Sequence, residues 1–222
     1  MIQINNLYFS YTKSSPYTLS NIDLTINDGE YISILGENGC GKSTLIKLIL
    51  NILLPSQGTI INTNKKIGYV PQKSDDFNSQ FPITVYEMLN CYRKILKIKD
   101  KGVITKSLEM INMLNFKNAL IGTLSGGQFQ KILITRALIG NPGLLILDEP
   151  STGVDITSQN DIYGLIKDLN KNHGITVISI EHNLKAAITN STLIYHLRNG
   201  NGHLCTPSAY ANEYLKSNKK PI

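Results

Sequence analysis

A glycine-rich segment early in the chain constrains its fold and chemistry more than any other feature. Residues 36–43 read Gly-Glu-Asn-Gly-Cys-Gly-Lys-Ser, which matches the G-x-x-x-x-G-K-[ST] pattern of a phosphate-binding loop. Residues 31–35 have the apolar pattern of a buried strand, and residues 45–52 have that of an apolar-faced helix. Because the pattern belongs between a strand and a helix, the sequence predicts a phosphate-binding loop at this position.

The residue types in this loop explain how it would bind a nucleoside triphosphate. Glycines at 36, 39 and 41 lack the Cβ atoms that would block phosphate oxygens, and the N–H groups that open the following helix favour an anion. Lys42 is expected to neutralise the β- and γ-phosphates, and the Ser43 hydroxyl is expected to hold Mg²⁺. The other positions expected to contact the nucleotide are Gly36, Glu37, Asn38, Gly39, Cys40, Gly41 and Thr44.

A second informative pattern is the apolar run at 144–147, which ends in Asp148 and Glu149. An apolar strand that ends in carboxylates has the form of a Walker B strand. Asp148 is expected to hold Mg²⁺ through its water shell, and Glu149 is expected to polarise the attacking water. The alternative is a pair of solvated loop carboxylates, but a phosphate-binding loop in the same chain favours the catalytic interpretation.

Length and composition set limits on the class of protein. With 222 residues, 41% of them hydrophobic and 17% charged, the chain is expected to be globular, with one core or one core and a smaller lobe. It has neither a run of about 20 apolar residues nor the pattern of a signal peptide, so we expect a cytoplasmic protein. Cysteines 40, 91 and 205 are widely spaced, which predicts neither a disulfide framework nor a zinc site.

The net charge of +6 is compatible with a nucleotide ligand or with a position near an anionic membrane face. Because the basic residues are dispersed, a solvated surface is favoured over a dedicated nucleic-acid patch. Cys40 lies inside the phosphate-binding loop, where it is interpreted as a tolerated small residue; oxidation of its thiol is the alternative.

The apolar pattern predicts an α/β fold. Residues 2–35 alternate between apolar and polar positions in short runs, which indicates antiparallel strands. Later strands have consecutive branched apolar residues, which suit a parallel sheet covered on both faces. We therefore expect an α/β core with an N-terminal antiparallel β subdomain and a helical insert at about residues 75–125. The other expected elements are strands near 58–61, 66–70, 144–147 and 175–180, and helices within 82–116 and over 159–169.

Residues 124–128 read Leu-Ser-Gly-Gly-Gln. Ser125 is a good N-cap for a helix that begins near Gly127, so the segment alone indicates only a turn before a helix. Placed between the phosphate-binding loop and the two carboxylates, it completes an ordered set of motifs. With this set the chain resembles the ATP-binding cassette (ABC) family, the nucleotide-binding subunits of ABC transporters, over at least residues 2–196. The resemblance implies a single ABC ATPase domain of the P-loop NTPase class over residues 1–222, with ATP and Mg²⁺ as cofactors.

The resemblance also assigns roles outside the phosphate-binding loop. In this family the signature segment, here Ser125, Gly126, Gly127 and Gln128, binds the γ-phosphate held by a second copy. This implies a head-to-tail dimer with two ATP molecules between the protomers. Gln72 resembles the glutamine that contacts Mg²⁺ or water and couples to the membrane partner.

Three further positions carry the resemblance. His182 resembles the switch histidine that contacts the γ-phosphate, and Asp155 resembles the aspartate near the dimer axis. Tyr11 resembles the aromatic residue that stacks on adenine, with a core tyrosine of the early sheet as the alternative. Two positions depart from the family pattern: Lys131 stands where arginine is more frequent, and Glu181 stands where a small residue is usual.

Residues 80–87, Gln-Phe-Pro-Ile-Thr-Val-Tyr-Glu, resemble a segment of the ATPase subunits of zinc and manganese uptake transporters. This resemblance implies import of a divalent metal ion through a separate permease, at the cytoplasmic side of the membrane, with an extracytoplasmic substrate-binding protein as a further partner. The alternatives are an iron-chelate or cobalamin importer, an exporter, and a soluble ABC ATPase without a role in transport. No nucleic-acid partner is expected.

Overall fold

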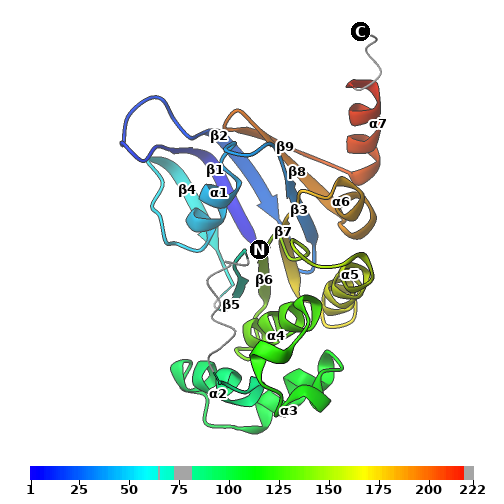
Figure 1. Cartoon of the computed structure of the whole chain (residues 1–222). Helices are drawn as coiled ribbons and strands as arrows, with labels where there is room; N and C mark the ends of the chain where they lie inside the picture. The colour runs from blue at the N-terminus through cyan, green and yellow to red at the C-terminus, as the bar shows by residue number, and fades with distance from the viewer. Residues whose placement is uncertain (65, 73–81, 218–222) are drawn as a thin grey trace.

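Two β-sheets organise the chain in the computed structural model, which describes residues 1–64, 66–72 and 82–217 (Figure 1). The smaller sheet is antiparallel, with the order β2–β1–β4. The larger has the order β5–β6–β7–β3–β8–β9, parallel from β5 to β8 and antiparallel at β9. The strands are β1 (Ile2–Phe9), β2 (Leu19–Ile26), β3 (Tyr31–Leu35), β4 (Gln57–Asn62), β5 (Ile67–Val70), β6 (Leu144–Asp148), β7 (Thr176–Ile180), β8 (Leu193–Arg198) and β9 (Asn201–Cys205).

Helices cover both faces of the larger sheet (Figure 1). Helix α1 (Lys42–Ile49) packs in one apolar cluster with the antiparallel sheet and one face of the larger sheet. The other face packs against α4 (Gly126–Leu138) and α5 (Ile156–Lys171) in a second cluster. That cluster also includes α2 (Val85–Ile95) and α3 (Gly102–Met110), while α6 (Leu184–Asn190) and α7 (Pro207–Ser217) pack near β8. Two short 3₁₀ turns are η1 (Leu114–Phe116) and η2 (Ile121–Thr123).

The strand β6 illustrates why the parallel strands are apolar at every position. Leu144 and Ile146 contribute to the cluster that contains α1, whereas Leu145 and Leu147 contribute to the cluster on the opposite face. Successive side chains of a strand point to opposite faces, so a strand covered on both sides needs no polar positions. All four of these side chains are fully buried.

The same argument explains one difference from the sequence expectation for residues 2–35. The strands β1 and β2 pair antiparallel, as expected, but β3 pairs in parallel with β7 and β8 in the larger sheet. Alternate residues of β2 are exposed, whereas every residue of β3 is buried. The continuous apolar run at 31–35 is therefore the pattern that separates β3 from the strands before it.

The helix expected over residues 45–52 ends earlier, at Ile49. Asn51 adopts a left-handed conformation with φ of 57°, and the N–H groups of Ile52 and Leu53 both donate to the carbonyl oxygen of Lys47. This turn exposes 64% of Ile52. Asparagine tolerates the left-handed region, so it ends the helix although the apolar pattern continues.

Helices α2 and α3 lie at the end of the molecule beyond α4 (Figure 1). Thr84 caps α2 in a capping box with Glu87, and it also forms a β-bridge with Leu120. The first part of the expected helical insert, together with residues 80–81 of the segment that resembles metal-uptake subunits, lies outside the described residues. Within the described ranges, no helix has the length and apolar character that a membrane span requires.

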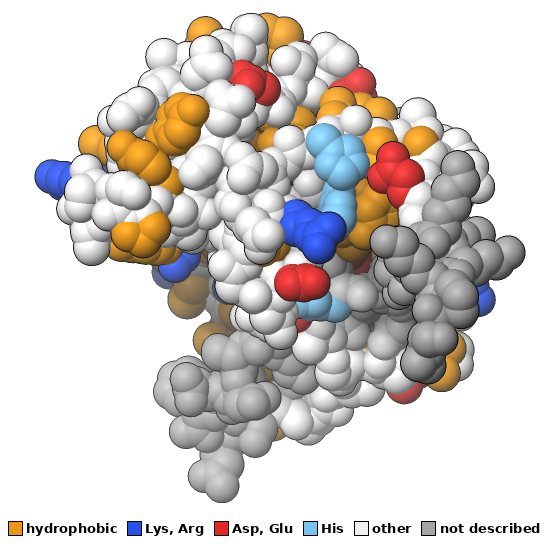
Figure 2. Space-filling view, turned by 90° about the horizontal axis from the view of Figure 1, so that it is seen from above, with side chains coloured by type: hydrophobic (Ala, Val, Ile, Leu, Met, Phe, Trp, Pro, Cys, Tyr) orange, Lys and Arg blue, Asp and Glu red, His pale blue; other side chains and the backbone are white. Residues whose placement is uncertain are grey.

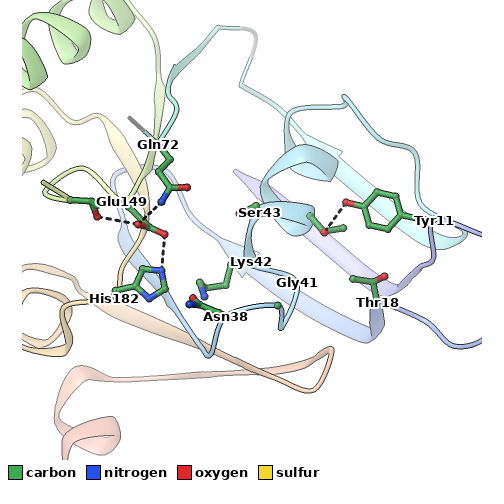
Figure 3. Close-up of a pocket in the computed structure, with 12 residues that line it drawn as sticks. Tyr11, Thr18, Asn38, Gly41, Lys42, Ser43, Gln72, Glu149 and His182 are labelled. Carbon is green, nitrogen blue, oxygen red and sulfur yellow. Dashed lines mark hydrogen bonds and ion pairs between the residues drawn. The ribbon is translucent and has the colours of Figure 1, made fainter. Parts of the chain in front are cut away.

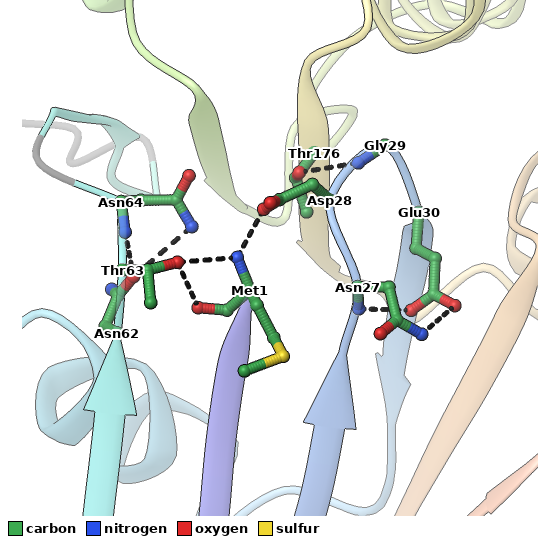
Figure 4. Close-up of polar contacts among 9 residues, drawn as sticks. All are labelled: Met1, Asn27, Asp28, Gly29, Glu30, Asn62, Thr63, Asn64 and Thr176. Atoms are coloured by element: carbon green, nitrogen blue, oxygen red, sulfur yellow. Dashed lines mark hydrogen bonds and ion pairs between the residues drawn. The ribbon is translucent and has the colours of Figure 1, made fainter.

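Polar contacts join the two sheets at the N-terminal edge of the larger one (Figure 4). The amino group of Met1 binds Asp28 and donates to Thr63 Oγ1 at 2.9 Å. The next residue, Gly29, donates its N–H to Thr176 Oγ1 in β7 at 2.9 Å. The turn before β3 is therefore held from both sheets, which fixes the direction in which β3 runs toward the loop that follows it.

Candidate functional site

The carboxyl ends of the parallel strands meet along one edge of the larger sheet. Gly36 follows β3 directly and Glu149 follows β6 directly. Gln72 lies two residues beyond β5, and His182 lies two residues beyond β7. These strands are neighbours in the order β5–β6–β7–β3, so residues distant in sequence converge there. Open parallel sheets bind ligands at this edge.

The loop between β3 and α1 has backbone positions that only glycine can occupy. A Cβ atom on Gly36 would collide with the carbonyl oxygen of Leu197. Gly41 adopts φ of 107° and leads directly into α1, and a Cβ atom there would lie 2.6 Å from Leu19 Cδ2. The loop is therefore packed closely under its glycines, and α1 begins at Lys42 with an N-cap that has no side chain.

Lys42 is buried to 7% exposure, and its ammonium group lies inside the curve of this loop. Its Nζ donates to the carbonyl oxygens of Gly36 at 2.8 Å and Glu37 at 2.9 Å. A buried cation whose hydrogen bonds within the described residues go to neutral carbonyls is well placed to bind an anion in the same loop. Cys40, by contrast, is buried in the apolar cluster around α1.

Asp148, the last residue of β6, is buried, with 7% of it exposed. Burial raises the pKa of its carboxyl group, the charge of Glu149 raises it further, and the charges of Lys42 and His182 oppose the shift. A cation at this position would offset the cost of keeping the carboxylate ionised.

The carboxylate of Glu149 is held by three side chains from three segments (Figure 3). Gln72 Nε2 donates to Oε2 at 2.8 Å, Thr152 Oγ1 donates to Oε2 at 3.0 Å, and His182 Nε2 lies 2.7 Å from Oε1. The backbone of Glu149 has φ of 52°, an uncommon left-handed conformation for a glutamate. Its N–H donates to the carbonyl oxygen of Ile180 at 3.1 Å, which fixes this turn against β7.

These groups open into one pocket of about 770 Å³, and Figure 3 shows Lys42 and Glu149 on opposite sides of it. Tyr11 lies at its far end, where its side chain is 61% exposed and its hydroxyl lies 3.1 Å from Thr44 Oγ1. The predicted residues that line the pocket are Tyr11, Asn38, Gly39, Gly41, Lys42, Ser43, Thr44, Gln72, Glu149 and His182. Gly36, Glu37, Cys40 and Asp148 do not line it, although the first three lie in the same loop and Asp148 directly precedes Glu149.

Two lining residues, Thr18 and Thr152, were not expected from the sequence. Thr152 lies in the turn after β6, three residues beyond Glu149, and a hydroxyl at that spacing is a local signal. Thr18 has no such signal. It precedes β2, and its N–H donates to the carbonyl oxygen of Phe9 at 2.8 Å, so it reaches the pocket only through the pairing of β1 with β2.

The signature segment does not line this pocket. Ser125 caps α4 in a capping box, in which Gln128 N–H donates to Ser125 Oγ at 3.2 Å and Ser125 N–H donates to Gln128 Oε1 at 3.0 Å. Gly127 packs so closely on α5 that a Cβ atom would lie 2.5 Å from Ser158 Cβ. Asp155 caps α5, and the N–H of Ser158 lowers the pKa of its carboxyl group.

The pocket offers oxygen ligands that suit Mg²⁺. Ser43 and Gln72 line the pocket, and the buried Asp148 directly precedes Glu149, which also lines it. Mg²⁺ prefers oxygen donors and keeps several waters, so this set fits the ion without a closed protein cage. Within the described ranges, no three His, Cys, Asp or Glu side chains are grouped closely enough to hold a metal ion by themselves.

Comparison with known proteins identifies the family of the chain. Residues 19–152 match the family model described as "ABC transporter". The chain is 51% identical to a "Probable metal transport system ATP-binding protein" of Treponema pallidum (strain Nichols), over 99% of this chain and 92% of the relative. It is 40% identical to the "High-affinity zinc uptake system ATP-binding protein ZnuC" of Bacillus subtilis (strain 168), over 82% and 84% of the two chains.

Solved structures extend the comparison to the fold. A dimeric bacterial ABC transporter cassette is 28% identical, with a TM-score of 0.77, and covers 93% of this chain and 99% of its own. The same cassette in a dimeric post-hydrolysis state bound to ADP and phosphate is 27% identical, with a TM-score of 0.76 and the same coverage. The expected fold class, an α/β core of the ABC type with an antiparallel β-sheet, is confirmed. The chain belongs to the ABC transporter family, of which it is an ATP-hydrolysing cassette.

Proposed function

We propose that this chain is the ATPase subunit of an ABC transporter that imports a divalent metal ion, zinc or manganese, through a separate membrane permease. The meeting of Lys42, Glu149 and His182 at one pocket carries the proposal of ATP hydrolysis. The relatives named for metal transport and for zinc uptake support the choice of a metal ion. Both conclusions concern one domain over residues 1–222, with a helical insert at about residues 75–125.

The phosphates of ATP bind along the loop at residues 36–44. Lys42 exchanges its two carbonyl partners for oxygens of the β- and γ-phosphates, since its ammonium group already lies within the loop. Ser43, Gln72 and Asp148 would hold Mg²⁺, directly or through water. When bound, Mg²⁺ neutralises charge on the phosphates. Tyr11 is exposed beside the loop and stacks on adenine.

Glu149 polarises the water that attacks the γ-phosphate. A catalytic base must lie within hydrogen-bond reach of its water, so Glu149 exchanges at least one of its three protein partners for that water. In this structure His182 binds Oε1 of the Glu149 carboxylate. When ATP is present, its imidazole turns toward the γ-phosphate. Hydrolysis then depends mainly on positioning and on charge neutralisation, as phosphoryl transfer generally does.

A second copy of the chain completes each site. Ser125, Gly126, Gly127 and Gln128 open α4 away from the pocket, so this chain cannot bring them to its own nucleotide. In a head-to-tail dimer they bind the γ-phosphate held by the partner, because the N-terminus of a helix favours an anion. Asp155 then lies near the dimer axis. The dimeric form of the solved cassette supports this arrangement.

Closure of the dimer moves the helical insert, and this movement is transmitted to the permease. The chain acts as a peripheral subunit on the cytoplasmic side of the membrane, with the permease and an extracytoplasmic substrate-binding protein as partners. Gln72 connects the nucleotide to the permease, because it binds Glu149 in the pocket. Residues 73–81, which follow it directly, lie outside the described ranges.

Two measurements test the two parts of the proposal separately. Purified protein given ATP and Mg²⁺ should release phosphate, and absence of release both alone and with the co-expressed permease would contradict ATP hydrolysis. Deletion of the gene should lower cellular zinc or manganese. The wild type and Lys47→Ala, which alters an exposed lysine of the same helix, should restore the metal content, whereas Lys42→Ala should not. Unchanged metal content with increased drug sensitivity would favour an exporter and contradict metal import.

A further inference from the structure

Glu181 is a buried carboxylate that the proposed hydrolysis does not use. It lies between the last residue of β7 and His182, and only 2% of it is exposed. Its Oε1 accepts a hydrogen bond from Ser179 Oγ, and its Oε2 accepts one from Tyr163 Oη of α5 at 2.7 Å. Its own N–H donates to the carbonyl oxygen of Ile34 in β3 at 3.1 Å. A buried glutamate is costly, so its presence here calls for a physical role.

The hydrogen bonds continue from Glu181 to the turn that contains Glu149. Tyr163 Oη lies 2.8 Å from Ser151 Oγ, and both residues are buried. The next residue, Thr152, donates to Glu149 at 3.0 Å. Since His182 follows Glu181 and also binds Glu149, the contacts form a closed path that joins the turn after β6 to the turn after β7.

We propose that Glu181 is a positioning residue for hydrolysis. Through Tyr163 and Ser151 it holds the turn at residues 149–155 against the end of β7, and its ionised form keeps the side chains of Glu149 and His182 in their relative positions. This inference rests on the proposed function, because it assumes that Glu149 and His182 act on ATP. Glu181 does not touch the nucleotide pocket.

The direction of the hydrogen bonds depends on the proton of Glu181. An ionised carboxylate only accepts, so Ser179 and Tyr163 must both donate to it, and the Tyr163 oxygen is left to accept from Ser151. A protonated Glu181 can donate to Tyr163, which can then donate to Ser151, so both hydrogen bonds reverse their direction. Only the ionised form therefore imposes a single arrangement on the turn that carries Glu149.

The surroundings of Glu181 bring this change of state close to neutral pH. The pKa of Glu181 is raised to about 7: burial is the main cause, the hydrogen bonds from Ser179 and Tyr163 oppose it, and the charge of Glu149 adds a smaller increase. Glu181 lines a hollow of about 510 Å³ together with His182, His196 and Arg198. Figure 2 shows His, basic and acidic side chains close together on one face of the molecule. The titratable and charged groups around Glu181 either line this hollow or interact with the Glu181 carboxyl group: Tyr31, Glu37, Glu149, Tyr163, His182, His196, Arg198 and Tyr210.

The test is the pH profile of ATP hydrolysis, measured as kcat and KM from pH 5.5 to 9 in the wild type and in Glu181→Gln. The amide mimics the protonated acid and cannot ionise. We expect kcat of the wild type to rise as pH increases through about 7, and Glu181→Gln to lose this rise with little change in KM. Glu109→Gln, which alters an exposed glutamate on α3, should keep the wild-type profile.

Two further variants separate positioning from bulk stability. Glu181→Ser and Tyr163→Phe break the same path, so each should lower kcat by about tenfold, and the double variant should lower it no further. If Glu181→Ser does not fold, the kcat values and pH profiles of Glu181→Gln and Tyr163→Phe test whether Glu181 positions the turn. A folded Glu181→Gln whose profile superimposes on that of the wild type overturns the inference. A wild type without ATPase activity instead contradicts the proposed function on which the inference rests.

Discussion

The imidazole Nε2 of His182 lies 2.7 Å from Oε1 of Glu149, although the two residues are 33 positions apart in the chain. The contact follows from the sheet. In the parallel pair β6 and β7, Asp148 lies opposite Ile180, and the N–H of Glu149 donates to the carbonyl oxygen of Ile180. The two side chains that leave these strand ends therefore meet above the sheet, and the strand register sets the geometry of the proposed catalytic pair.

Replacement of Glu149 by glutamine is expected to abolish turnover while ATP binding remains. Glutamine preserves shape and hydrogen bonds to Gln72, Thr152 or His182 but cannot act as a base, so kcat should fall by about 10²- to 10⁴-fold. Phosphate release measures the loss, and light scattering should show a dimer that persists with ATP. Hydrolysis near the wild-type rate would show that another group polarises the water.

Thr152 provides a test of a pocket residue that was not among the site residues expected from the sequence. Thr152→Val keeps the shape of the side chain but removes the donor to Glu149 Oε2, so kcat should fall by up to about tenfold with KM unchanged. Thr152→Ser retains the hydroxyl and should keep most of the activity. Equal kcat values for the valine and serine variants would mean that this hydrogen bond does not position Glu149.

Lys42→Ala is expected to weaken ATP binding. The side chain is buried and its ammonium group can form hydrogen bonds to charged phosphate oxygens, each contributing about 1.5–3 kcal/mol, so the Kd should increase by roughly tenfold or more. Calorimetry with ATP measures the change. Lys47→Ala removes an exposed lysine from the same helix and should bind ATP as the wild type does. An unchanged Kd for Lys42→Ala would exclude a phosphate-binding role.

The sequence located those parts of the candidate site that one segment contains. The glycines of residues 36–41 and the lysine that follows form a single loop, and the carboxylates after residues 144–147 follow a single buried strand. In both segments the local pattern predicts the backbone conformation and the chemistry of the side chains together. The fold class could be predicted for the same reason, since continuous apolar runs distinguish strands covered on both faces.

The sequence was insufficient where a role depends on contacts between segments. Thr18 reaches the pocket through strand pairing, and Glu181 connects to Ser151 only because α5 places Tyr163 between them. The end of α1 was missed because Asn51 reverses the backbone although the apolar pattern continues. These features follow from pairing, register and packing, which no periodicity in one segment specifies.

Glu181 also predicts how the stability of the protein depends on pH. Its pKa is raised from 4.5 to about 7 by burial, so below pH 4.5 the folded and unfolded states both carry the proton. As pH increases from 4.5 to 7 the unfolded state loses the proton first, and the folded state is destabilised by about 3 kcal/mol in total. Because the pKa of Glu181 is raised in the folded state, its contribution to the free energy of unfolding is complete at low pH and is lost as pH increases through about 7.

Glu181→Gln removes this titration, so the difference in unfolding free energy between the variant and the wild type should increase in favour of the variant from pH 5 to pH 8. Urea denaturation at several pH values measures it. Glu109→Gln, an exposed glutamate on α3, should give a difference that does not vary over this range. A difference that stays constant or narrows for Glu181→Gln would show that Glu181 ionises at its ordinary pKa.

Ser125→Arg tests whether a second copy completes the site. The arginine would stand at the start of α4, where the partner's nucleotide is proposed to bind, so ATP should still bind the monomer but should no longer drive dimer formation. Loss of the N-cap alone costs about 1 kcal/mol. Thr84→Ala removes the equivalent capping box from α2 and controls for that cost, because it should still dimerise. Light scattering of Glu149→Gln backgrounds with and without ATP compares the two variants. Normal ATP-dependent dimers of the arginine variant would contradict the shared site, whereas loss of dimers in both variants would trace the effect to helix capping, which also contradicts the assignment.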